Sequence, residues 1–269
     1  MALLRNLESG QTKVRLIQSE RPFSGPTNYE ELTSNLPELE NKLRDDSVFA
    51  TWTVVRAATF SENVAAGLEA LGGAFFRSDM IFLRLTPDKR RGQELERLVR
   101  DAASYDLGVV IYQDEPEDDD AEKENHPDTA ATPLSGTVHL VLDKPRKGWK
   151  LGTDLDQADL SLLLAYKPKR NWNTELAITA RLDSDNEGEE ALTYLHGAVE
   201  MARIPNAMMR TATSDEELDL CRVEGYPTAS LTLFSLSPEA NLETLRARGR
   251  AAGTACLFAM DSQRENALV

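Results

Sequence analysis

Hydrophobic residues follow two alternating spacings along the first half of the chain. Short runs of β-branched, aromatic and aliphatic residues at 49–57, 80–85 and 107–113 predict three strands. Between these runs, apolar residues recur at helical spacing, which predicts amphipathic helices over Glu62–Leu71 and from Pro87 onward. The apolar face of the second helix consists of Leu95, Leu98, Val99 and Ala102. Strands that alternate with amphipathic helices are typical of βαβ units in a parallel sheet.

The first 47 residues carry a weaker pattern. Alternating apolar residues favour a strand over 13–18, and a loop rich in Pro, Gly and Ser follows. Leucines at helical spacing between Tyr29 and Asp46 predict a short helix or two, because Pro37 interrupts the pattern.

A continuous apolar run opens the most informative stretch of the second half. Leu160–Ala165 has the length and composition of a strand that is buried on both faces. The basic segment Lys167–Arg170 contains Pro168 and should follow as a surface loop, because cations resist burial and proline lacks an N–H donor. Glu175–Leu182 then predicts a strand with one apolar face and one mostly solvent-exposed face.

The rest of the second half continues the alternation. Strands are predicted at Thr137–Leu142, Ala207–Thr211, Ala229–Leu236 and Thr254–Met260. Helices are predicted at Glu189–Arg203, at Asp215–Cys221, and from Pro238 to Gly253 with Ser237 as the N-cap.

The ends of the two halves share one pattern. IFLRLTPD, a helix and LGVVIYQ in the first half match LTLFSLSPE, a helix and TACLFAM in the second. Each is a strand, a Ser/Thr-Pro-acid helix start, a helix and a strand. One such start is common, and two in the same place favour pseudo-duplication over coincidence. We therefore predict an α/β protein of two pseudo-duplicated, Rossmann-like subdomains with mostly parallel sheets.

Composition and charge narrow the functional classes. The chain has 269 residues and a net charge of −15, and we expect no nucleic-acid partner because phosphate binding needs a basic face. Cys221 and Cys256 match neither a zinc site nor a dense disulfide framework, and both are expected to be reduced and packed. No apolar stretch approaches the roughly 20 residues of a membrane helix. Because residues 1–10 also lack the order of a signal peptide, we expect the chain as given to be soluble and intracellular.

The segment from Asp114 to Pro133 holds nine acidic residues against one lysine, and its charge of −8 is more than half of the total. Such a run is typical of a solvated linker or disordered loop, with a metal site or a basic-partner site as the alternative. We take it as the boundary between two subdomains. The expected division is a first α/β subdomain with its N-terminal lead-in at 1–115, an acidic linker at 116–133, and a second α/β subdomain at 134–269.

Motifs that bind nucleotides are absent from the sequence. There is no GxGxxG, no GxxxxGK[ST] and no GxSxG. The turns ATFSEN and DSDNEG carry acids where a phosphate requires amides and cations. The acids of the second turn, Asp183, Asp185 and Glu187, also miss the ligand pattern of a calcium loop.

The three histidines, His126, His139 and His196, do not form a site, and we expect His196 to pack partly buried on its helix. We therefore predict no catalytic, no cofactor-binding and no metal-binding residues.

One stretch of the second half carries a family resemblance. SLLLAYKPKRNWNTELAITARL, followed by an acidic turn and the helix EEALTYLHGAVEMARI, resembles the cytosolic C-terminal domain of cation-chloride cotransporters. In that family a strand, a Lys-rich loop ending in Trp, and a second strand leading to a helix lie in this order. Here they correspond to Leu160–Tyr166, Lys167–Trp172 and Glu175–Leu182. SYDLGVVIYQ is similar to the family's strand that ends the first half.

The resemblance covers most of Phe49–Met260 and is to a prokaryotic, Na-K-Cl-cotransporter-like member of the family. It implies two subdomains similar to universal stress proteins, attached to a twelve-helix transporter of sodium or potassium with chloride. It further implies a non-catalytic, regulatory domain without cofactor at the cytoplasmic face of the cell membrane. Its partners would be a second copy of itself, as a homodimer, and the transmembrane domain of the same polypeptide.

Other interpretations remain open at this point. The fold permits a free-standing, universal-stress-type nucleotide-binding protein, which the missing glycine loop opposes. It also permits an α/β enzyme, although no acid, base and nucleophile converge in the sequence. Lys167, Lys169 and Arg170 would be either a solvated loop or a contact for anionic lipid or an acidic partner.

Overall fold

The computed structural model describes residues 13–20, 37–38, 40–41, 44–45, 49–56, 62, 64–67, 80–85, 89–114 and 136–268. The chain divides into two compact units, Met1–Ser78 with Asp88–Leu98 and Asp79–Pro87 with Val99–Val269. The acidic segment 116–133 lies outside the described residues.

In the first unit, β1 (Lys13–Glu20) pairs in parallel with β2 (Phe49–Arg56) along its whole length. Both predicted strands are confirmed, and β1 extends two residues beyond the predicted 13–18. The helix predicted between Tyr29 and Asp46 is helical at 37–38, 40–41 and 44–45, and the next predicted helix is helical at 62 and 64–67. The rest of both lies outside the described residues.

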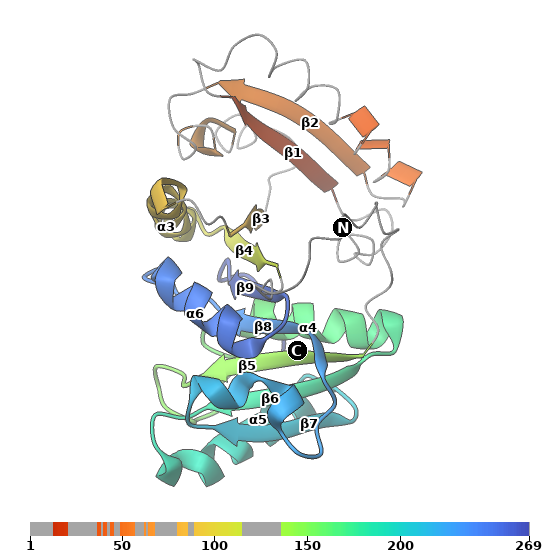
Figure 1. Ribbon diagram of the computed structural model, residues 1–269, viewed down its shortest axis with the longest axis vertical. Coiled ribbons are helices and arrows are strands. Elements are labelled where there is room, and N and C mark those ends of the chain that lie inside the picture. The colour runs from red at the N-terminus through yellow and green to blue at the C-terminus, as the bar shows by residue number, and fades with distance from the viewer. Residues whose placement is uncertain are drawn as a thin grey trace, which may run out of the picture. The chain divides into compact units, whose positions relative to one another are not determined.

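The second unit contains a seven-stranded sheet in the order β3-β4-β9-β8-β5-β6-β7 (Figure 1). Its strands are β3 (Met80–Arg84), β4 (Gly108–Gln113), β5 (Thr137–Asp143), β6 (Glu175–Arg181), β7 (Ala207–Ala212), β8 (Ala229–Ser235) and β9 (Cys256–Met260). All neighbours are parallel except β4 and β9, which are antiparallel. The predicted strands at these positions are confirmed.

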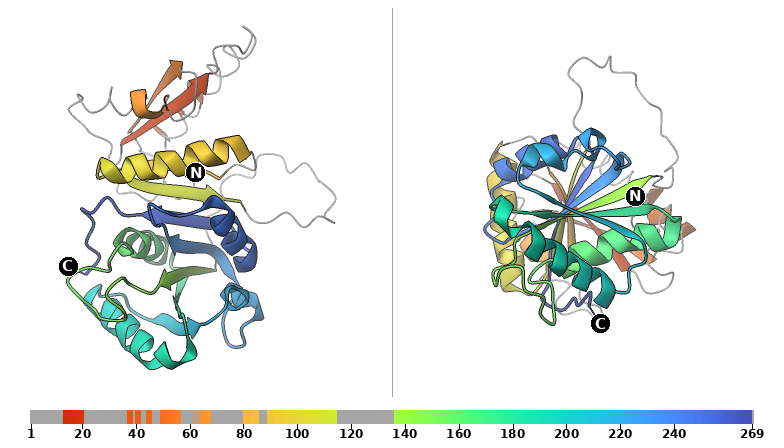
Figure 2. Two further views of the ribbon diagram at one scale, coloured as in Figure 1. Left: turned by 90° about the vertical axis from the view of Figure 1, so that its left-hand side faces the viewer. Right: turned by 90° about the horizontal axis from the view of Figure 1, so that it is seen from below.

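Helices cover both faces of this sheet where it is formed by β5 to β9 (Figure 2). One face packs against α4 (Asp159–Trp172) and α5 (Gly188–Met201), which is preceded by the short 3-10 helix η2 (Asp185–Glu187). The other face carries α6 (Leu242–Ala252) and the 3-10 helices η3 (Asp215–Leu218) and η4 (Leu220–Arg222). Right-handed crossovers explain the two layers, because the chain moves outward from β5 to β7 and then returns through β8 to β9.

The repeated pattern at the ends of the two halves corresponds to a structural repeat. In the first half, α3 (Lys89–Ser104) connects the parallel strands β3 and β4, and in the second, α6 connects the parallel strands β8 and β9. The last strands of the two repeats pair antiparallel, with Val110 opposite Ala259. An approximate two-fold axis between two copies reverses strand direction in this way. The predicted class, α/β with pseudo-duplicated and mostly parallel subdomains, is confirmed.

The predicted strand at Leu160–Ala165 is wrong, because these residues form the first turns of α4. The first turns of the helix are mostly apolar and pack on β5, β6, β8 and β9, and a short apolar window cannot distinguish such a helix from a buried strand. The basic segment Lys167–Arg170 is also helical and not a loop. Pro168 lies inside the helix and is buried, and α4 ends at Asn173, which has a left-handed φ of 55°.

The predicted exposed face of the strand at Glu175–Leu182 is wrong as well. Ala177 and Thr179 are fully buried in β6. Ala177 belongs to a small core cluster with Leu220 and Ala229, so the chain around η4 covers this face of the sheet. The strand pattern alone contains no information about a covering segment that follows some 40 residues later.

Three predicted helices also differ in their bounds, and the one predicted at Glu189–Arg203 is Gly188–Met201. The helix predicted to start at Pro238 begins at Leu242, because Asn241 is its N-cap and accepts a hydrogen bond from the Glu243 amide at 2.7 Å. The helix predicted at Asp215–Cys221 is divided into η3 and η4.

Candidate functional site

In an open parallel sheet, ligands usually bind beyond the carboxyl ends of the two strands whose connecting helices leave on opposite faces. In the second half of this chain, those strands are β5 and β8, since α4 follows β5 and α6 follows β8 on the other face. Asp143 ends β5 and Ser235 ends β8. The switch point of the sheet is therefore where a ligand site is expected.

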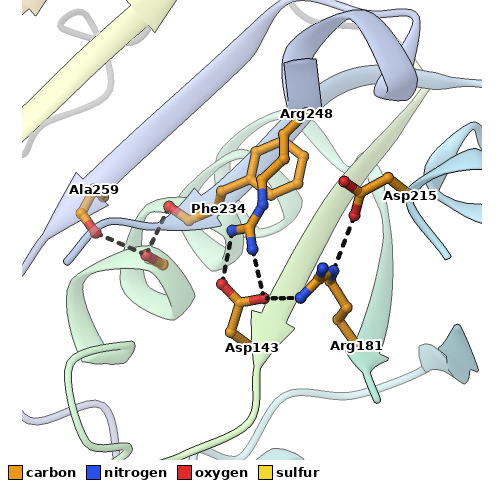
Figure 3. A network of polar contacts seen from close by, with 7 residues as sticks. Asp143, Arg181, Asp215, Phe234, Arg248 and Ala259 are labelled. Atoms are coloured by element: carbon orange, nitrogen blue, oxygen red, sulfur yellow. Dashed lines mark hydrogen bonds and ion pairs between the residues drawn. The ribbon is translucent and has the colours of Figure 1, made fainter. Parts of the chain in front are cut away.

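Four charged side chains meet at this switch point (Figure 3). Arg248 of α6 donates from Nη1 to Asp143 Oδ2 at 2.7 Å and from Nη2 to Asp143 Oδ1 at 3.2 Å. Arg181, the last residue of β6, donates from Nη1 to Asp143 Oδ1 at 3.5 Å and from Nε to Asp215 Oδ1 at 2.9 Å. We call this set, Asp143, Arg181, Asp215 and Arg248, the switch-point network.

The network is partly buried and its charges compensate each other. Burial by itself lowers the pKa of Arg181, but the hydrogen bond to Asp215 and the charge of Asp143 together raise that pKa above its usual value. The side chain of Arg248 is 14% exposed. Asp143 thus lies between two guanidinium groups, at the place where a nucleotide-binding relative of this fold would offer its donors to a phosphate.

The turns after β6 and β8 offer little to a phosphate, whereas the turn after β5, KPRKGWKLG, contains two glycines and four cations. No glycine lies in the turn after β8, LSPEAN, or among the first residues after β6, before Gly188 opens α5. In the turn after β6, Glu187 accepts hydrogen bonds from Lys144 Nζ at 2.5 Å and Trp149 Nε1 at 3.2 Å. The hydrogen bond from Lys144 lowers the pKa of Glu187, so this acid is engaged as an ion and not free for a calcium ion.

Within the ranges that the structure describes, no group of three or more acidic, histidine or cysteine side chains has the geometry of a metal site. His139 is buried on β5 and its Nε2 lies 2.8 Å from Thr179 Oγ1. Burial, with a smaller effect from Arg210, lowers the pKa of His139 to about 3, so it is neutral near pH 7. His196 is exposed, so the prediction that it packs partly buried is wrong, and His126 lies outside the described residues.

The two cysteines differ from one another. Cys256 is buried in β9 as expected, and burial raises the pKa of its thiol to about 12. Cys221 is exposed, contrary to the expectation that it is packed. Both are free thiols.

A second polar cluster, which the sequence did not indicate, joins the segment after β9 to the start of α4. Asp261 accepts hydrogen bonds from the amides of Asp159 and Leu160 at 3.1 Å and 2.9 Å and so caps α4. Asp159 in turn accepts from the amides of Leu155 and Ala267 at 2.9 Å and 2.7 Å. Burial, with the nearby charges of Asp159 and Glu265, raises the pKa of Asp261 to about 7. These residues are about 100 positions apart in sequence, so no local motif reveals them.

The basic residues near Lys167 lie at the carboxyl end of a helix, where cations are favoured by the helix dipole. Lys169 donates from Nζ to the carbonyl oxygen of Asn206 at 3.3 Å. This contact ties the end of α4 to the start of β7 and does not by itself indicate a lipid site.

The fold and the internally compensated switch point together define a universal-stress-like α/β architecture without a nucleotide signature. Solved structures of universal stress proteins share this fold at low identity. One from Archaeoglobus fulgidus DSM 4304 has a TM-score of 0.53 and 12% identity, over 96% of this chain and 89% of that one. A putative universal stress protein from Pseudomonas aeruginosa UCBPP-PA14 has a TM-score of 0.50 and 10% identity, over 96% and 94%.

A more similar structure is the cytoplasmic domain of a prokaryotic cation chloride cotransporter. It has a TM-score of 0.76 and 30% identity to this chain, over 98% of this chain and 91% of that chain. The family models for the first and second parts of the prokaryotic cation-chloride cotransporter C-terminal domain match residues 2–118 and 135–268. No curated protein matches the chain by sequence.

The chain therefore belongs to the C-terminal domains of prokaryotic cation-chloride cotransporters. This confirms the resemblance found in the sequence, and with it the expected place of the chain as the cytoplasmic domain of a membrane transporter. None of the helices in the described ranges is long and apolar enough to cross a membrane.

Proposed function

We propose that the chain is a non-catalytic, regulatory and dimerising domain of a cation-chloride cotransporter, with the transmembrane domain of the same polypeptide as its partner. The observation that carries the proposal is the 30% identity over 98% of the chain to a solved cytoplasmic domain of that family. The switch-point network supports it, because charges that neutralise one another leave no acid, base or nucleophile poised for chemistry at the switch point.

A regulatory role is tested in the full-length transporter. Chloride-dependent cation uptake is compared between cells or vesicles that carry the whole protein and those that carry it without this domain, at matched amounts in the membrane. A change in uptake rate supports regulation. Equal uptake per correctly inserted transporter contradicts it.

Dimerisation is proposed through the second half, on α5 or α6. Tethering to a membrane raises the effective concentration of such domains, so even a weak interface is sufficient. A two-fold pair would bring the same patch of each copy into contact. Met201 at the end of α5 is 42% exposed, and such a methionine is the kind of side chain that an interface would cover.

Sedimentation over a concentration series tests the dimer and its location. Met201→Glu on α5 and Ala247→Glu on α6 are matched variants, because each places one acid on an exposed position of one candidate helix. The variant that weakens association identifies the helix involved. A monomer up to about millimolar, the concentration that tethering supplies, contradicts dimerisation.

We further propose the division into subdomains at 1–115 and 134–269 with an acidic linker at 116–133. The boundaries of the two family matches, 2–118 and 135–268, support it. Replacing residues 117–132 by a short Gly/Ser linker should leave the melting temperature unchanged, because the segment has almost no apolar surface to bury. A fall of more than about 5 °C would show that it packs on the domain.

The alternative function is a universal-stress-type nucleotide-binding protein, which the shared fold favours. Calorimetry with ATP discriminates between the two. We expect no binding in the micromolar range, since the turns after β6 and β8 carry acids in place of the glycines and cations that a triphosphate needs.

A further inference from the structure

We infer that Arg181 and Arg248 form an oxyanion site at the β5–β8 switch point, and that the chain occupies this site with its own carboxylate, Asp143, in place of a phosphate-class anion. The inference goes beyond the proposed function, because it concerns the class of ligand that the switch point can bind and the residue that occupies its place.

The geometry of the contact is that of anion recognition. Both terminal nitrogens of Arg248 donate to the two oxygens of Asp143, at 2.7 Å and 3.2 Å, which is the bidentate fork by which arginine binds carboxylates and phosphates. Arg181 approaches the same carboxylate from the neighbouring strand at 3.5 Å. The side chains of Asp143 and Arg181 are 36% and 30% exposed, so the site that the two guanidinium groups form is accessible from solvent.

The donors of this site exceed the acceptors that Asp143 supplies. Arg248 Nε is buried and has no hydrogen-bond partner among the described residues. A carboxylate has two oxygens, and both already accept from Nη groups of the two arginines. The fork through Nη1 and Nη2 leaves Nε on another edge of the guanidinium group, so the additional oxygens of a tetrahedral oxyanion would accept from the second N–H groups of the Nη atoms.

The site also lies at the position where this kind of fold binds phosphates. The anion lies at the carboxyl end of β5, beside the end of β8, where open α/β sheets bind the phosphates of their ligands. Asp143 is the last residue of β5 and is fixed there by the strand. Its effective concentration at the two arginines is on the order of millimolar or more, so free phosphate cannot displace it at lower concentration.

The inference predicts that removing Asp143 opens the site to external oxyanions. In the 269-residue chain, Asp143→Ala leaves Arg181 and Arg248 without their shared acceptor, which should lower the melting temperature. Inorganic phosphate should restore it. We expect a rise of about 2–4 °C in phosphate relative to chloride at equal ionic strength, beyond the rise of the wild type.

Three controls separate a site from a general salt effect, since phosphate also strengthens burial in any protein. The wild type measures that background. Asp215→Ala removes an acid from the same network but leaves Asp143 in place, so it should respond as the wild type does. Asp143→Ala with Arg248→Gln removes the fork and should lose the rescue.

If phosphate raises the melting temperature of Asp143→Ala no more than that of the wild type, the inference is overturned. If this variant does not fold in chloride, Asp143→Asn keeps the side-chain volume, and calorimetric titration of that variant with inorganic phosphate gives the answer directly. Absence of binding there also overturns the inference. Rescue by inorganic phosphate and ATP to the same extent would assign the site to the oxyanion alone, and stronger rescue by ATP would add a nucleoside to the same oxyanion site.

Discussion

The two faces of the sheet formed by β5, β6 and β8 differ in what they bury. Toward α4 and α5, the strands present only apolar side chains at their centres: Val138, Leu140, Leu142, Leu176, Ile178, Ala180, Leu231 and Leu233. Toward α6, η3 and η4, the same strands alternate apolar residues with His139, Thr179 and Thr232, all with no exposed surface. Both faces are buried at these positions, but only the face toward α4 and α5 is entirely apolar there.

The polar face is organised in pairs. His139 Nε2 lies 2.8 Å from Thr179 Oγ1, and Thr232 Oγ1 lies 2.8 Å from Thr254 Oγ1. Phe234 and Phe258 stack between them and the carboxyl edge, with ring centroids 5.2 Å apart. At that edge the polar face ends in the switch-point network. Burial of apolar surface is the larger stabilising effect, so we expect the face toward α4 and α5 to supply more of the stability, and the face toward α6 to depend on its paired hydrogen bonds.

The largest effect should come from the apolar face. Ile178→Ala deletes a side chain that is 1% exposed, and should lower the free energy of unfolding by about 2–5 kcal/mol, through lost burial and the cavity left behind. Urea unfolding followed by circular dichroism measures it. A loss below about 1 kcal/mol would mean that this face repacks around the cavity and is not the more stabilising of the two faces.

The next effect lies on the polar face. Thr179→Val removes the hydrogen-bond partner of the buried His139 and should cost about 1–3 kcal/mol. Thr232→Val is the matched control, because Thr254 also donates to the carbonyl oxygen of Ala255 at 3.2 Å and keeps a partner. We expect the control to cost clearly less in the same urea assay. Equal losses would show that leaving His139 without its hydrogen-bond partner costs no more than replacing a buried threonine whose partner keeps another contact.

The pH dependence of stability should have opposite signs for His139, on the face toward α6, and for Asp261, at the start of α4. The folded-state pKa of His139, about 3, is below its ordinary value of 6.5, so its contribution to stability is present above pH 6.5 and is lost as the pH falls toward 3. The folded-state pKa of Asp261 at the start of α4, about 7, is above its ordinary value of 3.8. Its contribution is present below pH 3.8 and is lost as the pH rises through 7.

Asp261→Asn tests this sign near neutrality. The wild type should lose roughly 1 kcal/mol between pH 6 and pH 8 relative to the variant, since only the wild type ionises there. Melting temperatures at closely spaced pH values measure the difference. Parallel curves for the two proteins would show that Asp261 is already ionised at pH 6.

The smallest effects concern the ends of the helices on the two sides. Asn173 ends α4 with φ 55°, and Gly253 ends α6 with φ 65°. Asn173→Gly should stabilise the domain and Gly253→Asn should destabilise it, each by about 0.5 kcal/mol, because glycine tolerates the left-handed conformation best. Melting temperatures of the two variants provide the comparison, and shifts of the same sign would contradict it.

Local patterns along the chain were sufficient to predict the strands of the sheet, most of the helices, the repeat and the family. These features depend on apolar spacing, β-branched runs and caps within a few residues, so a window of the chain contains them. The switch-point network was not predicted, because the pairing of Asp143 with Arg181 depends on the register between β5 and β6.

The remaining features depend on contacts between segments that are distant in the sequence. Leu160–Ala165 lies in a helix that packs on one face of the sheet, against β5, β6, β8 and β9, and Ala177 of β6 is buried because the chain around η4 covers the other face. Arg248 reaches Asp143 across 105 positions, and Asp261 caps α4 across about 100. In each case the deciding contact is made by a segment far away in sequence. Its free energy depends on where the sheet topology places that segment, which no local pattern contains.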